Sequence, residues 1–126
     1  ISMQILDKND YDYKKPWRRR INKNFYFKVK KYLKSKNIKF GFGVYDINGI
    51  KDNKDLNIDF WKIISYRFYN DSLIKEAIKT KKDVYVSTGV SSLQEIRNCA
   101  KKHPRAKFIH TTLSKNISSN LLRNKY

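Results

Sequence analysis

The feature that most constrains the fold is a strand that runs directly into a capped helix in residues 82–96. Residues 82–86 read Lys-Asp-Val-Tyr-Val, a β-branched and aromatic run that is typical of a strand, and Ser87, Thr88 and Gly89 follow it. Ser92 and Glu95 have the spacing of a capping box, which predicts the start of a helix. The turn between strand and helix is assigned to Gly89, which tolerates a sharp bend. Such a junction directs hydroxyls and amides at one point and suits an oxyanion or phosphate, although an ordinary strand–helix turn without a ligand is the favoured explanation of this stretch taken alone.

The same strand–helix unit recurs along the chain. Helical patterns alternate with the strands, and a short helix or turn is expected over 48–57. Strands that alternate with helices predict parallel βα units, whose strands are buried on both faces and read as nearly continuous apolar runs. The expected strands are 3–6, 38–46, 58–65, 82–86 and 106–112, and the expected helical stripes are Phe25, Val29, Tyr32 and Leu33; Leu73, Ile74, Ala77 and Ile78; and Leu93, Ile96 and Ala100.

The order of several short segments carries a family resemblance. The most specific of them is Ser-Thr-Gly at 87–89 with Leu-x-Glu-Ile at 93–96, and Lys-Ile-x-Ser at 62–65 precedes it. Together they resemble the sialic acid synthase family, which makes N-acetylneuraminate, pseudaminate or legionaminate on a (β/α)8 barrel. The resemblance covers residues 25–113 and predicts an α/β fold of parallel βα repeats, a partial TIM barrel of about five strands. In chain order the matching segments are 34–40 and 44–46 (third strand), 61–65 (fourth), 80–96 (fifth and its helix) and 109–112 (sixth).

The resemblance implies a definite chemistry. The family condenses phosphoenolpyruvate with N-acetylmannosamine or a related amino sugar, forming a carbon–carbon bond and releasing phosphate, with a divalent metal, Mn or Mg, as cofactor. By the family pattern, phosphoenolpyruvate would contact Lys62, Ser65, Ser87 and Thr88, and Gln4 would lie near the sugar. A triply charged substrate needs cations and hydrogen-bond donors at one mouth, which parallel barrels provide at the carboxyl ends of their strands.

Some family positions hold other residues in this chain. The acidic residue expected after Lys-Ile-x-Ser is Arg67, and the lysine expected on the second strand is Ser2. Neither His103 nor His110 has a partner at metal-ligand spacing, so no metal ligand is assigned. Activity of this chain alone is therefore in doubt. The remaining departures are Phe42-Gly43 for a Ser-Thr pair, and Leu113 and Lys115 for an asparagine and a tyrosine.

The length of the chain also argues against activity of this chain alone. The chain has 126 residues, whereas a (β/α)8 barrel takes about 250. We expect residues 1–24 to form a strand and an irregular basic loop, and residues 25–126 to form an incomplete synthase-like barrel segment. The sequence begins with Ile1, so a truncated reading frame is the leading expectation. An open doubly wound sheet, or association with another copy through an exposed sheet edge, remains an alternative.

The high net charge suggests an alternative function. The net charge is +18, and residues 14–20 mix cations with a tryptophan, as in surfaces that bind nucleic acid. The alternative hypothesis is therefore a degenerate, non-catalytic basic domain that binds polyanions such as nucleic acid, or other protein chains. The basic charge also has an explanation that involves no function. Lys, Asn, Ile and Tyr are abundant while Gly and Pro are scarce, as a gene rich in A and T would encode, and lysines occur on almost every expected helix.

Two compositional features bear on location. No apolar run approaches the length of a transmembrane helix, so no membrane partner is expected, and the cytoplasm is the expected location. Cys99 is the single cysteine, so it has no intrachain disulfide partner, and its place in a helical pattern favours packing over catalysis.

Overall fold

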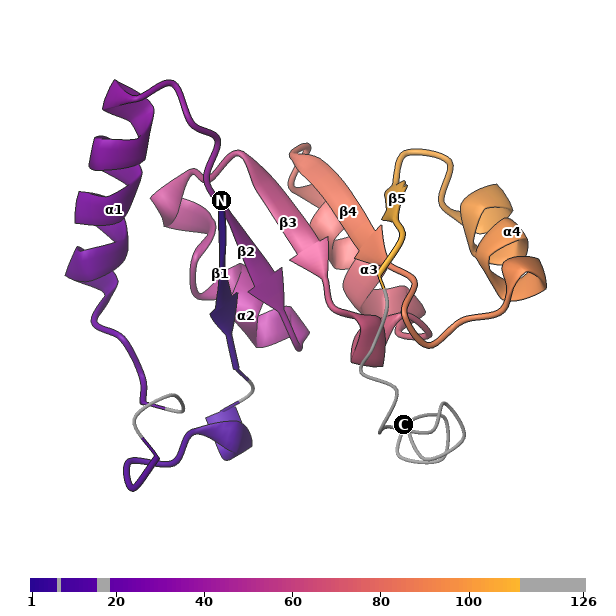
Figure 1. Ribbon diagram of the computed structural model, residues 1–126, viewed down its shortest axis with the longest axis horizontal. Helices are drawn as coiled ribbons and strands as arrows, with labels where there is room; N and C mark the ends of the chain where they lie inside the picture. Colours follow the sequence, from indigo (N-terminus) through magenta and orange to yellow (C-terminus); the bar gives the residue numbers. More distant parts are fainter. Residues whose placement is uncertain (7, 16–18, 112–126) are drawn as a thin grey trace.

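The computed structural model describes residues 1–6, 8–15 and 19–111, and within them the chain forms one five-stranded parallel sheet. The strands lie side by side in sequence order, and β1 and β5 are its open edges (Figure 1). The fold is α/β and resembles part of a TIM barrel, as predicted, and the sheet is not closed. The strands are β1 (Ser2–Ile5), β2 (Gly41–Val44), β3 (Phe60–Ile63), β4 (Asp83–Ser87) and β5 (Lys107–Ile109).

Helices follow the first four strands, which confirms the predicted alternation. The uncertain stretch 48–57 contains a short α-helix and a 3-10 turn. The division of the chain after residue 24 stays a prediction. The helices are α1 (Lys23–Ser35), α2 (Ile47–Lys51), α3 (Asp71–Lys79) and α4 (Leu93–Lys102), and the 3-10 turns are η1 (Lys8–Asp10), η3 (Lys54–Leu56) and η4 (Ser65–Arg67).

The register assigns successive side chains to opposite faces of the sheet. Phe42, Trp61 and Val84 are neighbours in one row and are almost completely buried on the face that the helices cover. The Trp61 ring nitrogen donates to the Thr80 hydroxyl at 2.9 Å, so this side chain packs outward against the helical layer, as its apolar strand context predicts. Gln4, Gly43, Lys62 and Tyr85 form the adjacent row on the opposite face, which would line the inside of a closed barrel.

The helices differ in how well their predicted faces match the structure. In α3 the predicted residues Leu73, Ile74 and Ala77 are buried. In α1 the prediction was partly wrong, because Phe25 and Tyr32 are exposed and the buried side chains are Tyr26 and Leu33. The inward face of α1 is thus rotated from the predicted stripe, and the Tyr26 ring packs edge-on against Phe42 with centroids 4.9 Å apart.

The turns that lead from helices into strands use an unusual backbone conformation. Asn37, Asn57 and Lys81 have φ values of 55°, 46° and 61°, in the left-handed region that glycine adopts most easily. They precede β2, β3 and β4 respectively. By contrast, no glycine has a positive φ among the described residues, so the bend assigned to Gly89 does not depend on left-handed geometry.

Candidate active site

The sequence-predicted hydroxyl residues gather at the carboxyl ends of β3 and β4. Ser65 begins η4 two residues after the end of β3, Ser87 is the last residue of β4, and Thr88 follows it. All three are buried, with exposures of 7%, 1% and 7%. Since parallel strands end at the same edge of the sheet, side chains distant in sequence meet there.

Hydrogen bonds join these residues across three strands. The Ser65 hydroxyl accepts from the Gly89 amide at 3.3 Å and lies 3.1 Å from the Thr111 hydroxyl. The Thr88 amide and hydroxyl both donate to the carbonyl of Ile109, at 3.1 and 3.2 Å. Thr111 was not among the predicted site residues. Its signal was the pair of threonines at the end of the last expected strand, 106–112, where the carboxyl-end rule also applies.

The Ser87 hydroxyl is different, because it is buried and has no hydrogen-bond partner among the described residues. A buried, unsatisfied donor or acceptor costs roughly 1–3 kcal/mol. A polar group in this condition at the end of a parallel strand is a candidate for contact with a ligand oxygen.

Lys62 lies on the same face of the sheet as Ser87. Lys62 is paired in register with Tyr85, and Ser87 lies two residues beyond Tyr85 on β4, so the three share a face. Gln4 lies in the same row, with only Gly43 between it and Lys62. A Cβ atom at Gly43 would lie 3.4 Å from the Gln4 side chain. Because Gly43 has no side chain, the sheet surface between Gln4 and Lys62 is left open.

The positions that depart from the family pattern have local roles. The Arg67 guanidinium donates to the Tyr45 carbonyl at 2.8 Å, so it joins the segment after β3 to the segment after β2. Ser2 is an exposed residue of β1 paired with Gly41, at the amino end of the strand. Leu113 and Lys115 lie outside the described residues.

The described residues can be searched for ligands of the metal that the family implies. Across residues 1–6, 8–15 and 19–111 there is no group of three or more His, Cys, Asp or Glu side chains placed to hold an ion. His103 instead bonds Asp71, the first residue of α3, through Nε2 at 2.6 Å. The described residues therefore do not fit a metal centre, and Cys99 is half-buried with its thiol pKa raised by burial.

With this geometry in view, comparison with known proteins identifies the lineage. The family model for the NeuB family matches residues 4–119, nearly the whole sequence. The chain belongs to the NeuB family. No curated protein matches it.

Two solved structures share the fold of this NeuB-family chain. The N-acetylneuraminic acid (sialic acid) synthetase of Leptospira borgpetersenii serovar Hardjo-bovis, solved with citrate, aligns with a TM-score of 0.73 and 22% identity over 99% of the chain. The spore coat polysaccharide biosynthesis protein spsE of Bacillus subtilis aligns with a TM-score of 0.74 and 13% identity over 90% of the chain. The chain spans 50% and 35% of their respective lengths. It is therefore a NeuB-family domain that shares its fold with part of each of these proteins.

Two further expectations concern the surroundings of this NeuB-family domain. None of the described helices combines the length and the hydrophobicity needed to traverse a bilayer. Of the basic segment 14–20, residues 16–18 lie outside the described part, so its predicted role in polyanion binding stays a prediction.

Proposed function

We propose that this domain supplies the phosphoenolpyruvate-binding part of a synthase that condenses phosphoenolpyruvate with an N-acetylated amino sugar, such as N-acetylmannosamine. The product would be a nonulosonic acid, which makes the domain a transferase component of carbohydrate biosynthesis. The observation that carries the proposal is the unsatisfied Ser87 hydroxyl on the same sheet face as Lys62, in a chain of the NeuB family.

The proposed roles follow from charge and hydrogen-bonding capacity. Phosphoenolpyruvate is an anion of three charges with carboxylate and phosphate oxygens. The Lys62 ammonium would neutralise part of that charge, and the hydroxyls of Ser65, Ser87 and Thr88 would donate to its oxygens. Gln4, in the same row two strands away, would reach the amino sugar with its amide. In the reaction a new carbon–carbon bond joins the two substrates, one water molecule adds at the carbon that carries the phosphate, and the bond from that carbon to the phosphate group breaks to release inorganic phosphate.

Binding of phosphoenolpyruvate would replace some hydrogen bonds within the chain by hydrogen bonds to the substrate. The Ser65 hydroxyl is already bonded to Gly89 and Thr111, so a substrate oxygen would take the place of Thr111. Ser87 would gain its first partner and lose the penalty of its unsatisfied hydroxyl. Because Ser87 is only 1% exposed, its engagement requires the strand ends to open slightly. The metal that the family uses has no fitting ligands in the described residues, so no step is assigned to it.

The direct test is titration of phosphoenolpyruvate into the purified chain, followed by calorimetry and by amide NMR. We expect saturable binding with shifts at Ser65, Thr88 and Gly89, and a loss of about tenfold or more in affinity for Lys62→Ala, since charge-assisted hydrogen bonds are worth roughly 1.5–3 kcal/mol. Ser87→Ala should weaken binding less.

Lys51→Ala is the matched control, because it removes the same charge from an exposed position of α2. If Lys51→Ala and Lys62→Ala weaken binding equally, the anion is responding to net charge alone and the proposed cradle is wrong. Absence of any binding by a folded chain would reject it too.

A further inference from the structure

A basic groove lies at the end of the sheet opposite the candidate active site. A groove of about 340 Å³ lies where α1 ends and where β2, β3 and β4 begin. It is at the amino ends of the strands, whereas Ser65 and Ser87 are at the carboxyl ends. In barrels of this kind the amino ends do not carry the reaction, so the synthase substrate does not account for its charge. The polar residues that line it include Lys30, Lys34, Lys39, Lys82, Asn37 and Asn57.

The lysines of this groove are not neutralised by acids. The Lys30 ammonium donates to the Leu56 carbonyl at 2.8 Å, and the Lys82 ammonium donates to the Asn57 side-chain oxygen at 2.5 Å. Both acceptors are uncharged, so both positive charges persist. Among the described residues no ion pair joins Lys30, Lys34, Lys39 or Lys82 to a carboxylate.

The two acids near the groove are already engaged. One oxygen of the Asp59 carboxylate accepts from the Phe40 amide at 2.8 Å. Asp83 is paired with Lys107 at 2.8 Å, and this bond, together with the more distant charge of Lys39, lowers the pKa of Asp83. Four ammonium groups therefore face one lining carboxylate, and like charges at this density repel each other unless an anion neutralises them.

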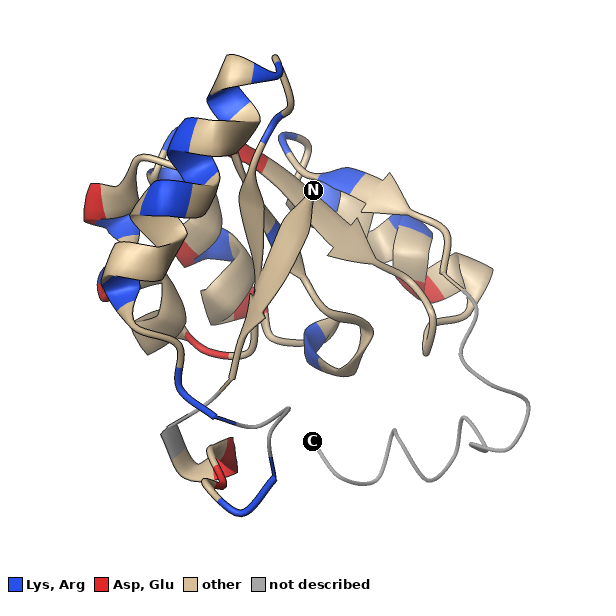
Figure 2. Cartoon of the chain, turned by 60° about the vertical axis from the view of Figure 1, so that its left-hand side comes forward, with Lys and Arg blue, Asp and Glu red and all other residues tan. Residues whose placement is uncertain are grey.

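Helix α1 lies beside the groove, and one of its faces extends the basic surface of the groove. Lys23, Phe27, Lys30 and Lys34 are spaced i, i+4, i+7 and i+11, which places them on one stripe of α1. Phe27 is 45% exposed within that stripe. No acidic residue occurs in α1, and Figure 2 shows lysines over much of its surface. Lys23 is paired with Asp55 at 2.6 Å, so the stripe combines the exposed Phe27 ring with two lysines, Lys30 and Lys34, that have no carboxylate partner among the described residues.

We propose that the groove and this stripe of α1 bind single-stranded nucleic acid. The phosphates would occupy the groove among Lys30, Lys34, Lys39 and Lys82, and a base would stack on Phe27. An open groove lined by cations, with an exposed ring beside it, is the combination that proteins use for single strands. A concave site suits a phosphate backbone better than the plane of a bilayer. The inference does not depend on the proposed synthase function, because the two sites lie at opposite ends of the strands.

The test is fluorescence anisotropy of a labelled uridine oligonucleotide with the full chain, measured across a range of salt concentrations. The double variant Lys34→Ala/Lys39→Ala should weaken binding on the order of tenfold and reduce the salt slope by about 1.4, since each lost phosphate contact removes about 0.7. The matched control is Lys51→Ala/Lys101→Ala, which removes the same charge from exposed positions on α2 and α4.

Four outcomes would overturn the inference. Equal weakening by the two double variants would mean that net charge alone attracts the oligonucleotide. Unchanged oligonucleotide affinity in Phe27→Ala, or equal affinity for inorganic polyphosphate, would mean that no base is recognised. Tighter binding to phosphatidylserine vesicles than to the oligonucleotide would assign the surface to membranes. Phosphoenolpyruvate binding should be the same in Lys34→Ala/Lys39→Ala as in the parent chain, and this measurement keeps the two sites distinguishable.

Discussion

Helices α3 and α4 are similar in length and amphipathic pattern, yet they are attached to the sheet in different ways. In α3 the side chains of Leu73, Ile74 and Ala77 are buried in the core. In α4 no residue is buried, and Leu93 is 63% exposed although it leads the predicted apolar stripe. Periodicity therefore indicates which face of a helix turns inward, but the neighbouring elements decide how much of that face is covered.

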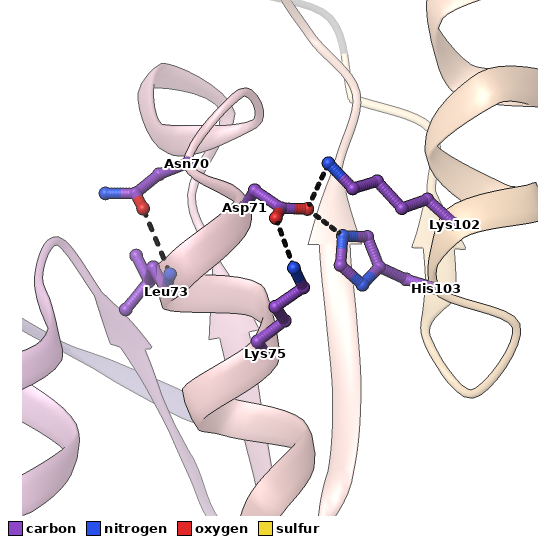
Figure 3. Close-up of polar contacts among 6 residues, drawn as sticks. All are labelled: Asn70, Asp71, Leu73, Lys75, Lys102 and His103. Carbon is purple, nitrogen blue, oxygen red and sulfur yellow. Dashed lines mark hydrogen bonds and ion pairs between the residues drawn. The ribbon is translucent and has the colours of Figure 1, made fainter.

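Polar contacts compensate for the weak packing of α4. Figure 3 shows Asp71, at the start of α3, bonded to three groups. His103, which follows α4 and is 4% exposed, contacts the Asp71 carboxylate through Nε2 at 2.6 Å, and Lys102 contacts the same oxygen at 3.0 Å. Lys75 holds the second oxygen at 2.8 Å. One carboxylate thus ties the end of α4 to the beginning of α3.

The largest expected effect comes from the core of α3. Leu73→Ala should destabilise the chain by about 3 kcal/mol, because it leaves a cavity where a completely buried side chain packs. Leu93→Ala, the same change on α4, should alter stability by less than about 0.5 kcal/mol. Urea unfolding of both variants measures the difference, and equal losses would show that α4 is packed as tightly as α3.

The next effect concerns the polar tie of α4. In His103→Ala the end of α4 loses its buried contact with Asp71, so amides of α4 should exchange with solvent faster while those of α3 remain protected. Native-state hydrogen exchange followed by NMR reads both helices in one sample. Lys101→Ala, an exposed change on the same helix, is the control and should leave exchange unaltered. Uniform loss of protection in both helices would contradict the comparison.

A smaller effect is expected at the other end of α4. Ser92 and Glu95 form the predicted capping box, with the Ser92 amide donating to Glu95 at 2.7 Å. Ser92→Ala should cost about 1 kcal/mol of local helix stability, seen as lower amide protection in the first turn. Ser92→Asp preserves a capping oxygen and should keep that protection. If Ser92→Ala has no effect on α4, packing rather than capping defines its start.

The smallest effect is that of pH. Hydrogen bonds from Lys75, then Lys102 and His103, hold the pKa of Asp71 well below its usual range. A carboxyl whose folded pKa is depressed contributes stability above its unfolded pKa, about 3.9, and loses that contribution as pH falls toward the folded value. Protection of α4 should therefore decline below about pH 4, weakly because these contacts face solvent and salt. Asp71→Asn should flatten this dependence, and an unaltered profile in that variant would exclude Asp71 as its cause.

Much of the fold was predictable because it rests on local patterns. The strand pattern at 82–86, the capping box at Ser92 and the apolar stripe of α3 each depend on neighbouring residues, and each is confirmed. The face of α1 was predicted wrongly, since Phe25 and Tyr26 are both aromatic and only the docking angle of the helix decides which is buried.

The candidate site was predictable only in part. The carboxyl-end rule places Ser65, Ser87 and Thr88 together, but the link from Ser65 to Thr111 arises from a register that the sequence does not reveal. The lysine groove could not be read from the sequence either, because Lys30 and Lys82 lie far apart in the chain and lysines occur throughout it. Whether these side chains bind phosphoenolpyruvate stays a prediction.

The left-handed residues before the strands show where the chain can be improved. Lys81 adopts φ 61° between α3 and β4, a conformation that costs a side-chain-bearing residue roughly 1 kcal/mol relative to glycine. This strain is local to one turn and is smaller than the packing contribution of a core residue such as Leu73. Lys81→Gly would relieve that backbone strain and so favour the folded state of the chain.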